Sequence, residues 1–159
     1  MNVKFPAVII QQAVDRALID GIQKKVAWAV IMINWKILLC KRTEDEFMPW
    51  LIELPSGNID SWESIIDWLC REVYEETWLE VDSIEYYIWR FDYTSWSGKK
   101  ARQFNFIVNC KSGDIKLNPQ EHSEYFLIEP SDIPATELKI SESTKKVLID
   151  STTYLGYKS

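Results

Sequence analysis

The chain has 159 residues, of which 47% are hydrophobic, and a formal net charge of -6 at pH 7. A chain of this length has the size of one domain and can bury a hydrophobic core. The net negative charge argues against extended DNA or RNA as a partner, because non-specific binding of nucleic acid depends on Lys and Arg that neutralise phosphates. We therefore expect one domain over residues 1–159, with residues 1–24 as an N-terminal helical extension.

Targeting signals and covalent cross-links are not expected. The longest apolar stretches, such as 26–33, are much shorter than the 18 or more residues of a membrane-spanning helix. The first residues lack the basic n-region, long apolar core and cleavage site of a signal peptide. Cys40, Cys70 and Cys110 fit neither a zinc cluster nor an even set of disulfides. These features predict a cytoplasmic protein with reduced, mostly buried thiols and no membrane contact.

The first predicted elements are a helix and a β-hairpin. Apolar residues recur at helical spacing over residues 9–20. Two runs rich in β-forming residues follow at 25–33 and 36–41. They are separated by Asn34 and Trp35, a gap of the size that predicts a hairpin, although tryptophan is a poor residue for a turn that needs positive φ.

A short strand, a turn and the central helix are expected next. Residues 51–54 read as a brief strand and 55–57 as a turn. The helix is predicted to start near Asp60 or Ser61. Asp60 and Glu63 have the spacing of a capping box, in which two side chains satisfy backbone donors at the start of a helix.

The remaining chain alternates strands with helical segments. The predicted elements are a long hairpin of strands 83–93 and 102–108 around the polar loop 94–100, a strand at 124–128, and helical segments at 131–138 and 141–150. Mixed strands, one central helix, more strands and a final helix favour an α/β or α+β sandwich over a doubly wound parallel sheet.

Three carboxylates gather on the central helix. Glu75 and Glu76 lie three and four positions after Glu72, so Glu72 shares a helix face with both. Like charges at this spacing repel, and acids near a helix C-terminus also oppose the macrodipole. A hard divalent cation such as Mg²⁺ would remove that penalty, since it prefers oxygen ligands. The alternative is an ordinary solvated helical face.

The segment 57–79 resembles the Nudix box, the signature of a family of hydrolases. Eight of its nine defined positions match, and they are Gly57, Glu63, Arg71, Glu72, Val73, Glu75, Glu76 and Leu79. The ninth, a glycine in the family, is Trp78. KILLCKR followed by ELPSG is also similar to the strand, arginine and turn that precede the box. The resemblance implies a Nudix α/β/α sandwich with a mixed sheet.

The resemblance also implies roles for the matching residues. The expected catalytic group is Glu63, Arg71, Glu72, Glu75 and Glu76. Among these, the last three glutamates would bind Mg²⁺, with Mn²⁺ as a substitute, and Glu63 and Arg71 would tie the preceding loop to the helix. Alternatively, Glu63 and Arg71 form only an ordinary ion pair at the surface. Downstream, Glu121 would be a further metal ligand or base, or else belong to an acidic loop ahead of a strand.

The activity implied is Mg²⁺-dependent hydrolysis of a diphosphate linkage in a nucleoside-diphosphate-linked small molecule, such as a nucleoside triphosphate or ADP-ribose. Substrate contacts are expected from Arg42, Gly57, Arg90 and Arg102, although each arginine alone is more often a solubilising charge. His122 is the single histidine and no nucleophile elbow accompanies it, which argues against a serine or cysteine hydrolase.

Tryptophan replaces small residues at several points. The chain has eight tryptophans and only five glycines. Trp78 and Trp62 stand where the family has glycine, and Trp50 and Trp96 lie in turn-like contexts. Two readings stay open, an active hydrolase and a catalytically impaired Nudix-fold module that binds a nucleotide or a partner. Substrate identity, the catalytic base and homodimerisation through the leading helix also stay open.

Overall fold

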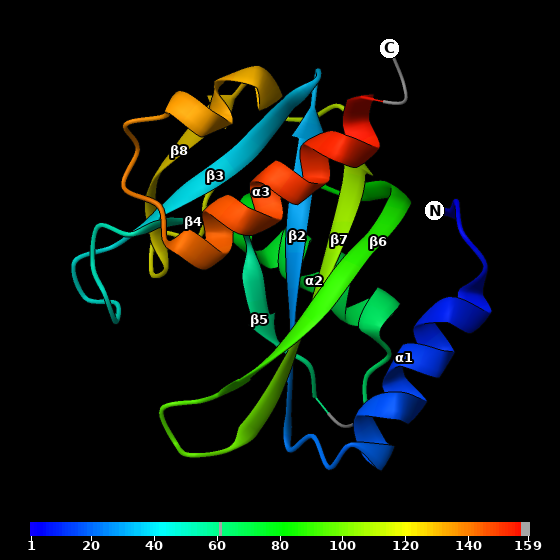
Figure 1. Ribbon diagram of the computed structural model, residues 1–159. Helices are drawn as coiled ribbons and strands as arrows, with labels where there is room; N and C mark the ends of the chain where they lie inside the picture. Colours follow the sequence, from blue (N-terminus) through cyan, green and yellow to red (C-terminus); the bar gives the residue numbers. More distant parts are fainter. Residues whose placement is uncertain (61, 157–159) are drawn as a thin grey trace.

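The computed structural model describes residues 1–60 and 62–156 and is built around an eight-stranded mixed sheet (Figure 1). The strands are β1 (Asn2–Val3), β2 (Lys24–Ile33), β3 (Lys36–Arg42), β4 (Ile52–Glu53), β5 (Ser56–Asn58), β6 (Val81–Thr94), β7 (Lys100–Cys110) and β8 (His122–Ile128). The helices are α1 (Ala7–Ile19), α2 (Ile65–Thr77), the 3-10 helix η1 (Pro130–Ala135) and α3 (Glu142–Leu155).

The sheet mixes parallel and antiparallel pairs. Its main path runs β1-β6-β7-β2-β3-β4, with β5 paired to β2 and β8 paired to β3. The two central strands β2 and β7 are parallel, in register from Lys24 opposite Ala101 to Met32 opposite Asn109. The long β6–β7 hairpin is antiparallel. A central parallel pair must be covered on both faces, because its strands have no solvated side.

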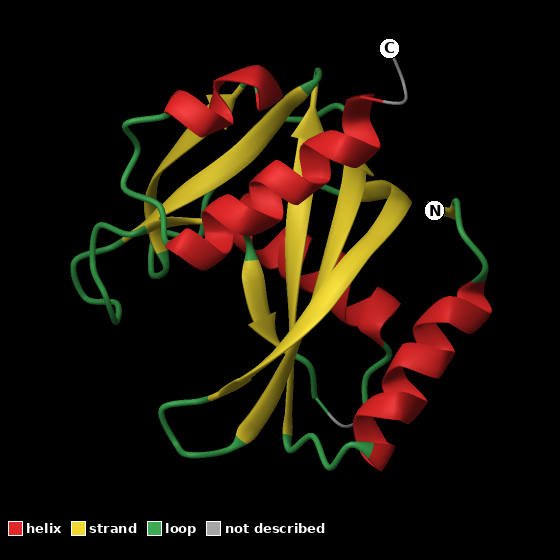
Figure 2. Ribbon diagram, viewed as in Figure 1, coloured by secondary structure: helices red, strands yellow, loops and turns green. Residues whose placement is uncertain are grey.

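Helices supply that cover in two layers (Figure 2). Along β2, Ala29 and Ile31 belong to a hydrophobic cluster that includes the buried residues of α1 and α2. The intervening Val30 and Met32 belong to a second cluster, with η1 and α3. Successive side chains of a strand point to opposite faces, so β2 contributes to both clusters. The predicted α/β/α sandwich with a mixed sheet is confirmed.

The start of the central helix differs from the prediction. The helix α2 begins at Ile65, and the Ser64 hydroxyl caps it by accepting a hydrogen bond from the backbone N–H of Asp67 at 3.1 Å. The backbone carbonyl of Asp60 instead accepts from the N–H of Glu63 in the preceding turn. The predicted cap at Asp60 is therefore wrong, and the alternative start at Ser61 lies outside the described residues.

Two other segments also differ. Residues Ser56 and Gly57, predicted as a turn, form β5 and pair with Trp28 and Ala27 of β2. The predicted helix at 131–138 is the six-residue 3-10 helix η1, which has Pro134 inside it. Proline cannot donate the backbone hydrogen bond that an α-helix interior requires.

The hairpin between β2 and β3 is confirmed. Asn34 and Trp35 form its turn with φ of 48° and 68°. Positive φ at both central residues is the geometry that usually selects Asn-Gly. Trp50 and Trp78 also have positive φ, of 69° and 66°.

The three cysteines are unpaired, as the sequence predicts. Cys40 is buried, and Cys70 and Cys110 are half-buried. Within the described residues, no helix combines the length and the hydrophobicity needed to span a membrane.

Candidate active site

The helix α2 decides which glutamates turn inward. Its buried stripe is Ile65, Trp68, Leu69, Val73, Glu76 and Thr77. Glu76 is three residues beyond Val73 and so continues the apolar stripe, while Glu75 is rotated toward solvent with 53% of its side chain exposed. Glu72 lies at the edge of the stripe, with 18% of its side chain exposed. The three predicted ligands therefore lie in three different environments.

Arg71 gathers the other carboxylates of the box. Its Nε and Nη2 donate to the two carboxylate oxygens of Glu63, both at 2.8 Å. Its Nη1 donates to Glu72 at 2.8 Å and to Glu75 at 3.0 Å. The hydrogen bond from Arg71 holds the pKa of Glu63 below its usual value. A bidentate pair of this kind fixes the geometry of both partners, so Glu63 ties the loop before α2 to the helix.

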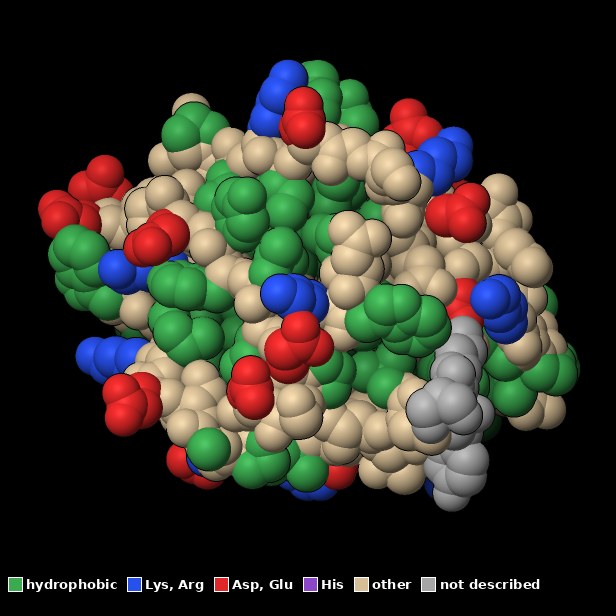
Figure 3. Space-filling view, turned by 90° about the horizontal axis from the view of Figure 1, so that it is seen from above, with side chains coloured by type: hydrophobic (Ala, Val, Ile, Leu, Met, Phe, Trp, Pro, Cys, Tyr) green, Lys and Arg blue, Asp and Glu red, His purple; other side chains and the backbone are tan. Residues whose placement is uncertain are grey.

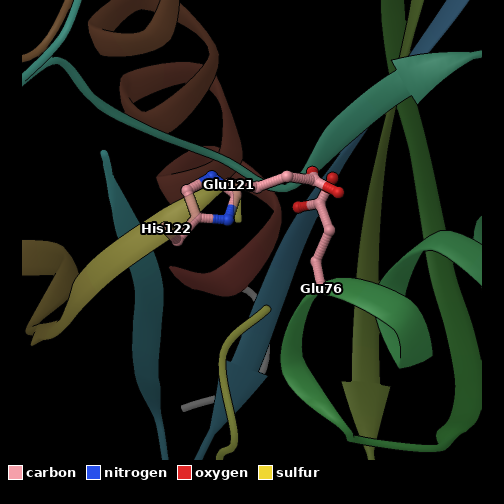
Figure 4. Close-up of side chains that lie close together, drawn as sticks. All are labelled: Glu76, Glu121 and His122. Carbon is pink, nitrogen blue, oxygen red and sulfur yellow. The ribbon is translucent and has the colours of Figure 1, made fainter. Parts of the chain in front are cut away.

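Glu76 faces a different group of side chains. Glu76, Glu121 and His122 each place a potential ligand atom within 4.8 Å of the others, and we call these three residues the Glu76 cluster (Figure 4). The carboxylates of Glu76 and Glu121 point toward one another, and the imidazole of His122 lies beside them. The structure thus brings Glu76 and Glu121 together, as predicted, whereas Glu72 and Glu75 are bound to Arg71.

The loop before β8 reaches this place by capping α2. The backbone N–H of Lys116 donates to the carbonyl of Thr77 at 2.9 Å, and that of Asn118 donates to the carbonyl of Glu76 at 3.1 Å. These bonds satisfy carbonyl groups left free at the helix end. The side-chain amide of Asn118 then donates to Glu121 at 2.8 Å. The hydrogen bonds between this loop and the end of α2 therefore position Glu121 next to the carboxylate of Glu76.

Burial and neighbouring negative charges make the charged form of Glu76 unfavourable. Burial raises the pKa of Glu76 well above its usual value, and the negative charges of Glu121, Glu72 and Glu53 raise it further. A backbone hydrogen bond from Ser56 opposes them. Burial also raises the pKa of Glu72. A bound cation would compensate both effects, since it favours the charged form of each carboxylate.

Arg42 and Glu53 form a second ion pair, which lies beside the Glu76 cluster. Nη2 of Arg42 lies 2.7 Å from Glu53, and Nε2 of His122 lies 3.2 Å from the other oxygen of Glu53. Burial raises the pKa of Glu53, but the bonds from His122 and Arg42 outweigh it and hold the pKa below its usual value. Arg42 also donates to the backbone carbonyl of Phe47. These side chains and the Glu76 cluster surround a cavity of about 130 Å³.

Glu72 and Trp68 approach Gly57 closely. A Cβ atom at this position would lie 3.1 Å from Cδ of Glu72 and 3.1 Å from the ring of Trp68. Contacts that short force a neighbour to shift. Gly57, predicted to contact substrate, therefore has a packing role toward a box carboxylate.

The predicted arginines of the β6–β7 hairpin lie elsewhere. Arg102 is almost buried, and its guanidinium binds Asp92 at 2.6 Å and Asp20 at 2.9 Å. Neither aspartate belongs to the Glu76 cluster, so Arg102 joins β7 to β6 and to the end of α1. Its predicted substrate contact is not supported by this placement. Arg90 lies exposed on β6, opposite Phe104.

Another cavity, of about 430 Å³, lies near the β2–β3 turn and is lined by residues that include Met32, Trp35, Leu79, Tyr86, Ile107 and Leu155. Hydrophobic side chains reach the surface at this end of the molecule, between charged ones (Figure 3). None of the predicted site residues lines this cavity. The carboxylates place the candidate active site at the smaller, polar cavity.

The sequence reasoning missed Glu53 and the proximity of His122. Glu53 lies on β4, two residues before the turn-like Pro55, and nothing in its local pattern distinguishes it from a surface carboxylate. His122 is adjacent in sequence to Glu121, and the pair of ligand-type residues was the available signal.

The comparisons with known proteins agree with this geometry. A family model described as the NUDIX domain matches residues 23–150. Among curated proteins, no relative matches the chain in sequence. Several hundred solved structures match, and three of them illustrate the range.

The three structures share the fold at low sequence identity. A MutT NUDIX hydrolase from Burkholderia pseudomallei is 20% identical, with a TM-score of 0.67 over 80% of this chain and 96% of that one. The E. coli ORF135 protein is 22% identical, with a TM-score of 0.67 over 82% and 89%. A C. elegans Ap4A hydrolase is 21% identical, with a TM-score of 0.60 over 84% and 98%. The fold is thus shared with these proteins, and the family model, which matches 128 residues, shows that the chain belongs to the Nudix family of hydrolases.

Proposed function

We propose that the protein hydrolyses a diphosphate linkage in a nucleoside-diphosphate-linked small molecule and depends on Mg²⁺, or on Mn²⁺ in its place. The observation that carries the proposal is the buried carboxylate of Glu76. Its Oε2 atom has no hydrogen-bond partner among the residues that the structure describes, and it faces Glu121. An unpaired buried carboxylate oxygen is costly unless a cation binds it.

The residues present fit a divalent cation. Glu76 and Glu121 supply carboxylate oxygens, and Glu72 lies near enough that its negative charge raises the pKa of Glu76. Mg²⁺ is usually held by one or two carboxylates together with substrate phosphates. When bound, such an ion acts as a Lewis acid: its positive charge stabilises negative charge on the diphosphate oxygens and makes the phosphorus easier to attack.

The side chains around the cation site have positioning roles in this proposal. Arg71 holds Glu72 and Glu75 in place and ties them to Glu63. Arg42, at the rim of the cavity, adds a cation that can face a phosphate of the substrate while it pairs with Glu53. The oxygen of a water molecule attacks one phosphorus of the diphosphate, and the bond from that phosphorus to the bridging oxygen breaks. The other phosphate leaves with the bridging oxygen, the proton of the water passes to solvent, and two phosphorylated products result.

The substrate class is supported by two proteins of similar structure. One is an Ap4A hydrolase, and another is described as an ADP compounds hydrolase, 12% identical, with a TM-score of 0.68. Both names concern nucleotides that contain a diphosphate linkage. ADP-ribose, nucleoside triphosphates and diadenosine polyphosphates therefore form the first panel for this chain.

A metal-controlled assay tests the reaction. Purified protein is incubated with this panel and Mg²⁺ or Mn²⁺, and products are separated by chromatography. We expect turnover of at least one compound, its loss in excess EDTA, and a drop of more than about 100-fold in Glu76→Gln. The matched control is Glu137→Gln, because Glu137 is exposed and lies outside the cavity. Undiminished activity in EDTA would refute metal dependence.

A second candidate function is nucleotide binding without turnover. It is favoured by Trp78, which ends α2 at φ 66° in the place of the family's glycine. A displacement near 1 Å in a catalytic group can cost about 100-fold in rate. This candidate predicts a nucleotide-dependent rise in Tm with no product, and turnover above background would exclude it.

We also propose that the protein forms a homodimer and is located in the cytoplasm. Leu18 and Ile19 at the end of α1 are largely exposed, which supports the leading helix as the contact surface. Sedimentation of the purified chain would show the oligomeric state.

A further inference from the structure

His122, the single histidine of the chain, is buried beside the carboxylates and has no role in the proposed reaction. It begins β8 opposite Arg42, at a point where the register of the β3–β8 pair shifts. Only 3% of the residue is exposed. Its backbone N–H donates to the carbonyl of Asn118 at 2.9 Å, so the loop that positions Glu121 also fixes His122.

The two ring nitrogens of His122 differ in their surroundings. Nε2 lies 3.2 Å from Glu53, whose other oxygen is held by Arg42. Nδ1 is buried and has no hydrogen-bond partner among the described residues. A histidine that binds a metal commonly donates its other ring N–H to a carboxylate, which fixes the tautomer and the ring orientation. With the proton on Nε2 and directed to Glu53, the lone pair of Nδ1 is free.

Two unpaired buried atoms therefore belong to the residues of one cluster. Oε2 of Glu76 and Nδ1 of His122 both lack a partner in the described part of the chain, and they belong to the same three residues whose ligand atoms lie within 4.8 Å. Figure 4 shows the imidazole beside the two carboxylates, with a ring nitrogen on their side. Buried polar atoms are normally paired, so two unpaired ones at one place indicate a shared ligand.

We propose that His122 binds the metal ion through Nδ1, together with Glu76 and Glu121, and that Glu53 and Arg42 hold its ring in place. The inference rests on the proposed metal site but does not require turnover. A nitrogen ligand shifts preference from Mg²⁺, which favours oxygen, toward transition metals that accept imidazole. The site is thus expected to bind Mn²⁺ and Co²⁺ with a larger advantage over Mg²⁺ than carboxylates alone would give.

The single histidine permits a direct test on the full chain. Protein labelled with ¹⁵N-histidine is loaded with Mn²⁺ without nucleotide, and electron spin echo spectra are compared with those of unlabelled protein. We expect a nitrogen coupling that changes with the isotope, which assigns it to residue 122. Mn²⁺ bound without any histidine coupling would overturn the proposal while leaving the metal site intact. No Mn²⁺ binding would overturn both.

Binding titrations of variants complete the test. His122→Asn is expected to weaken Mn²⁺ binding about 10- to 100-fold and Mg²⁺ binding much less. Glu53→Gln keeps an acceptor for Nε2 and should produce a smaller loss, with the nitrogen coupling retained. Glu137→Gln is the control for surface charge. Equal losses of Mg²⁺ and Mn²⁺ in His122→Asn would contradict a ligand that selects between the metals.

A separate observation concerns the tryptophans. Three of the five residues other than glycine with positive φ, counted over the described ranges, are Trp35, Trp50 and Trp78. A bulky residue with positive φ is a conformational outlier. Five tryptophans also expose between 47% and 91% of their surface, namely Trp35, Trp50, Trp62, Trp78 and Trp96. Tryptophan is on average a highly buried residue, whereas Trp35, Trp50 and Trp78 combine high exposure with the positive φ that glycine adopts readily.

Composition points the same way. The chain has five glycines in 159 residues, whereas ordinary usage of about 7% corresponds to roughly eleven. The codon UGA is read as tryptophan in some genetic codes and as glycine in others. We infer that residues 35, 50 and 78 are glycine when the natural host translates this protein, and that UGA encodes them.

The codons and the native protein decide this inference. We expect UGA at all three positions, and peptides of the protein isolated from its natural host should carry glycine there by mass spectrometry. Trypsin cleavage after Lys and Arg places residue 35 on the peptide 26–36 and residue 78 on the peptide 72–90, and both peptides have a length suited to mass spectrometry. A UGG codon at these positions, or tryptophan in the native peptides, would overturn the inference.

Discussion

Trp78 shows how one residue sets the end of the central helix. It has φ 66° and ψ 13°, a conformation that costs residues other than glycine about 1 to 2 kcal/mol. Its indole stacks on Tyr74 with ring centroids 4.9 Å apart, and Nζ of Lys116 lies 5.8 Å from its centroid. Aromatic and cation contacts at exposed sites are worth about 0.5 to 1 kcal/mol each and offset part of the strain.

Two substitutions at residue 78 separate these contributions. Trp78→Gly and Trp78→Ala both remove the indole contacts, but only glycine removes the Cβ atom. We expect the glycine variant to be more stable than the alanine variant by about 1 to 2 kcal/mol in denaturant unfolding. Equal stability of the two would contradict a left-handed helix end.

Arg71 is the residue that holds three box carboxylates at once. Lysine retains the charge but lacks the planar fork that binds both oxygens of Glu63. We expect Arg71→Lys to lower Tm and to reduce turnover by at least about 10-fold. Arg16→Lys is the control, because the Arg16 side chain that pairs with Asp20 is largely exposed, and it should change stability by less than about 0.5 kcal/mol. If the two variants behave alike, Arg71 does not position the site.

At the scale of elements, the sequence predicted most helices and strands because their patterns are local. Asn34 and Trp35 separate two runs of β-forming residues by a gap as short as a hairpin turn, and the structure has a hairpin there. β5 escaped prediction because Ser56 and Gly57 read as a turn, and only their pairing with β2 makes them a strand. The two-residue β1 is too short to show any periodicity.

Arg102 joins three elements, and this predicts a pH dependence of stability. Its hydrogen bonds to Asp92 on β6 and to Asp20 after α1 are the main reason that the pKa of each aspartate lies below the ordinary 3.8. A carboxyl with a lowered folded pKa stabilises the fold above its unfolded pKa. This contribution disappears as the pH falls from that value through the folded pKa.

Arg102→Gln is therefore expected to lower Tm at neutral pH, and the difference from wild type should shrink below about pH 4. Thermal unfolding at a series of pH values measures it. Lys111→Gln, at an exposed pair with Glu80, should produce a smaller change. A difference in Tm that stays constant down to about pH 3 would mean that Arg102 acts only through packing.

At the scale of the molecule, the site is assembled from distant segments. Glu76 comes from α2, Glu53 from β4, Glu121 from the end of the loop before β8, and His122 from the first position of β8. The sequence predicted the box and Glu121 through a family resemblance, but local patterns do not show which carboxylates meet in space. Helical phase offered a further signal, because Glu76 continues the stripe of Leu69 and Val73 while Glu75 does not.

The central claim is that Glu76 and Glu121, with His122, hold a divalent cation in this fold. A crystal grown with Mn²⁺ and measured at a wavelength where manganese scatters anomalously tests it most directly. The account predicts an anomalous peak within coordination distance of Glu76 and Glu121. A saturated crystal with no manganese at these two side chains, or with manganese only on exposed carboxylates, would contradict it.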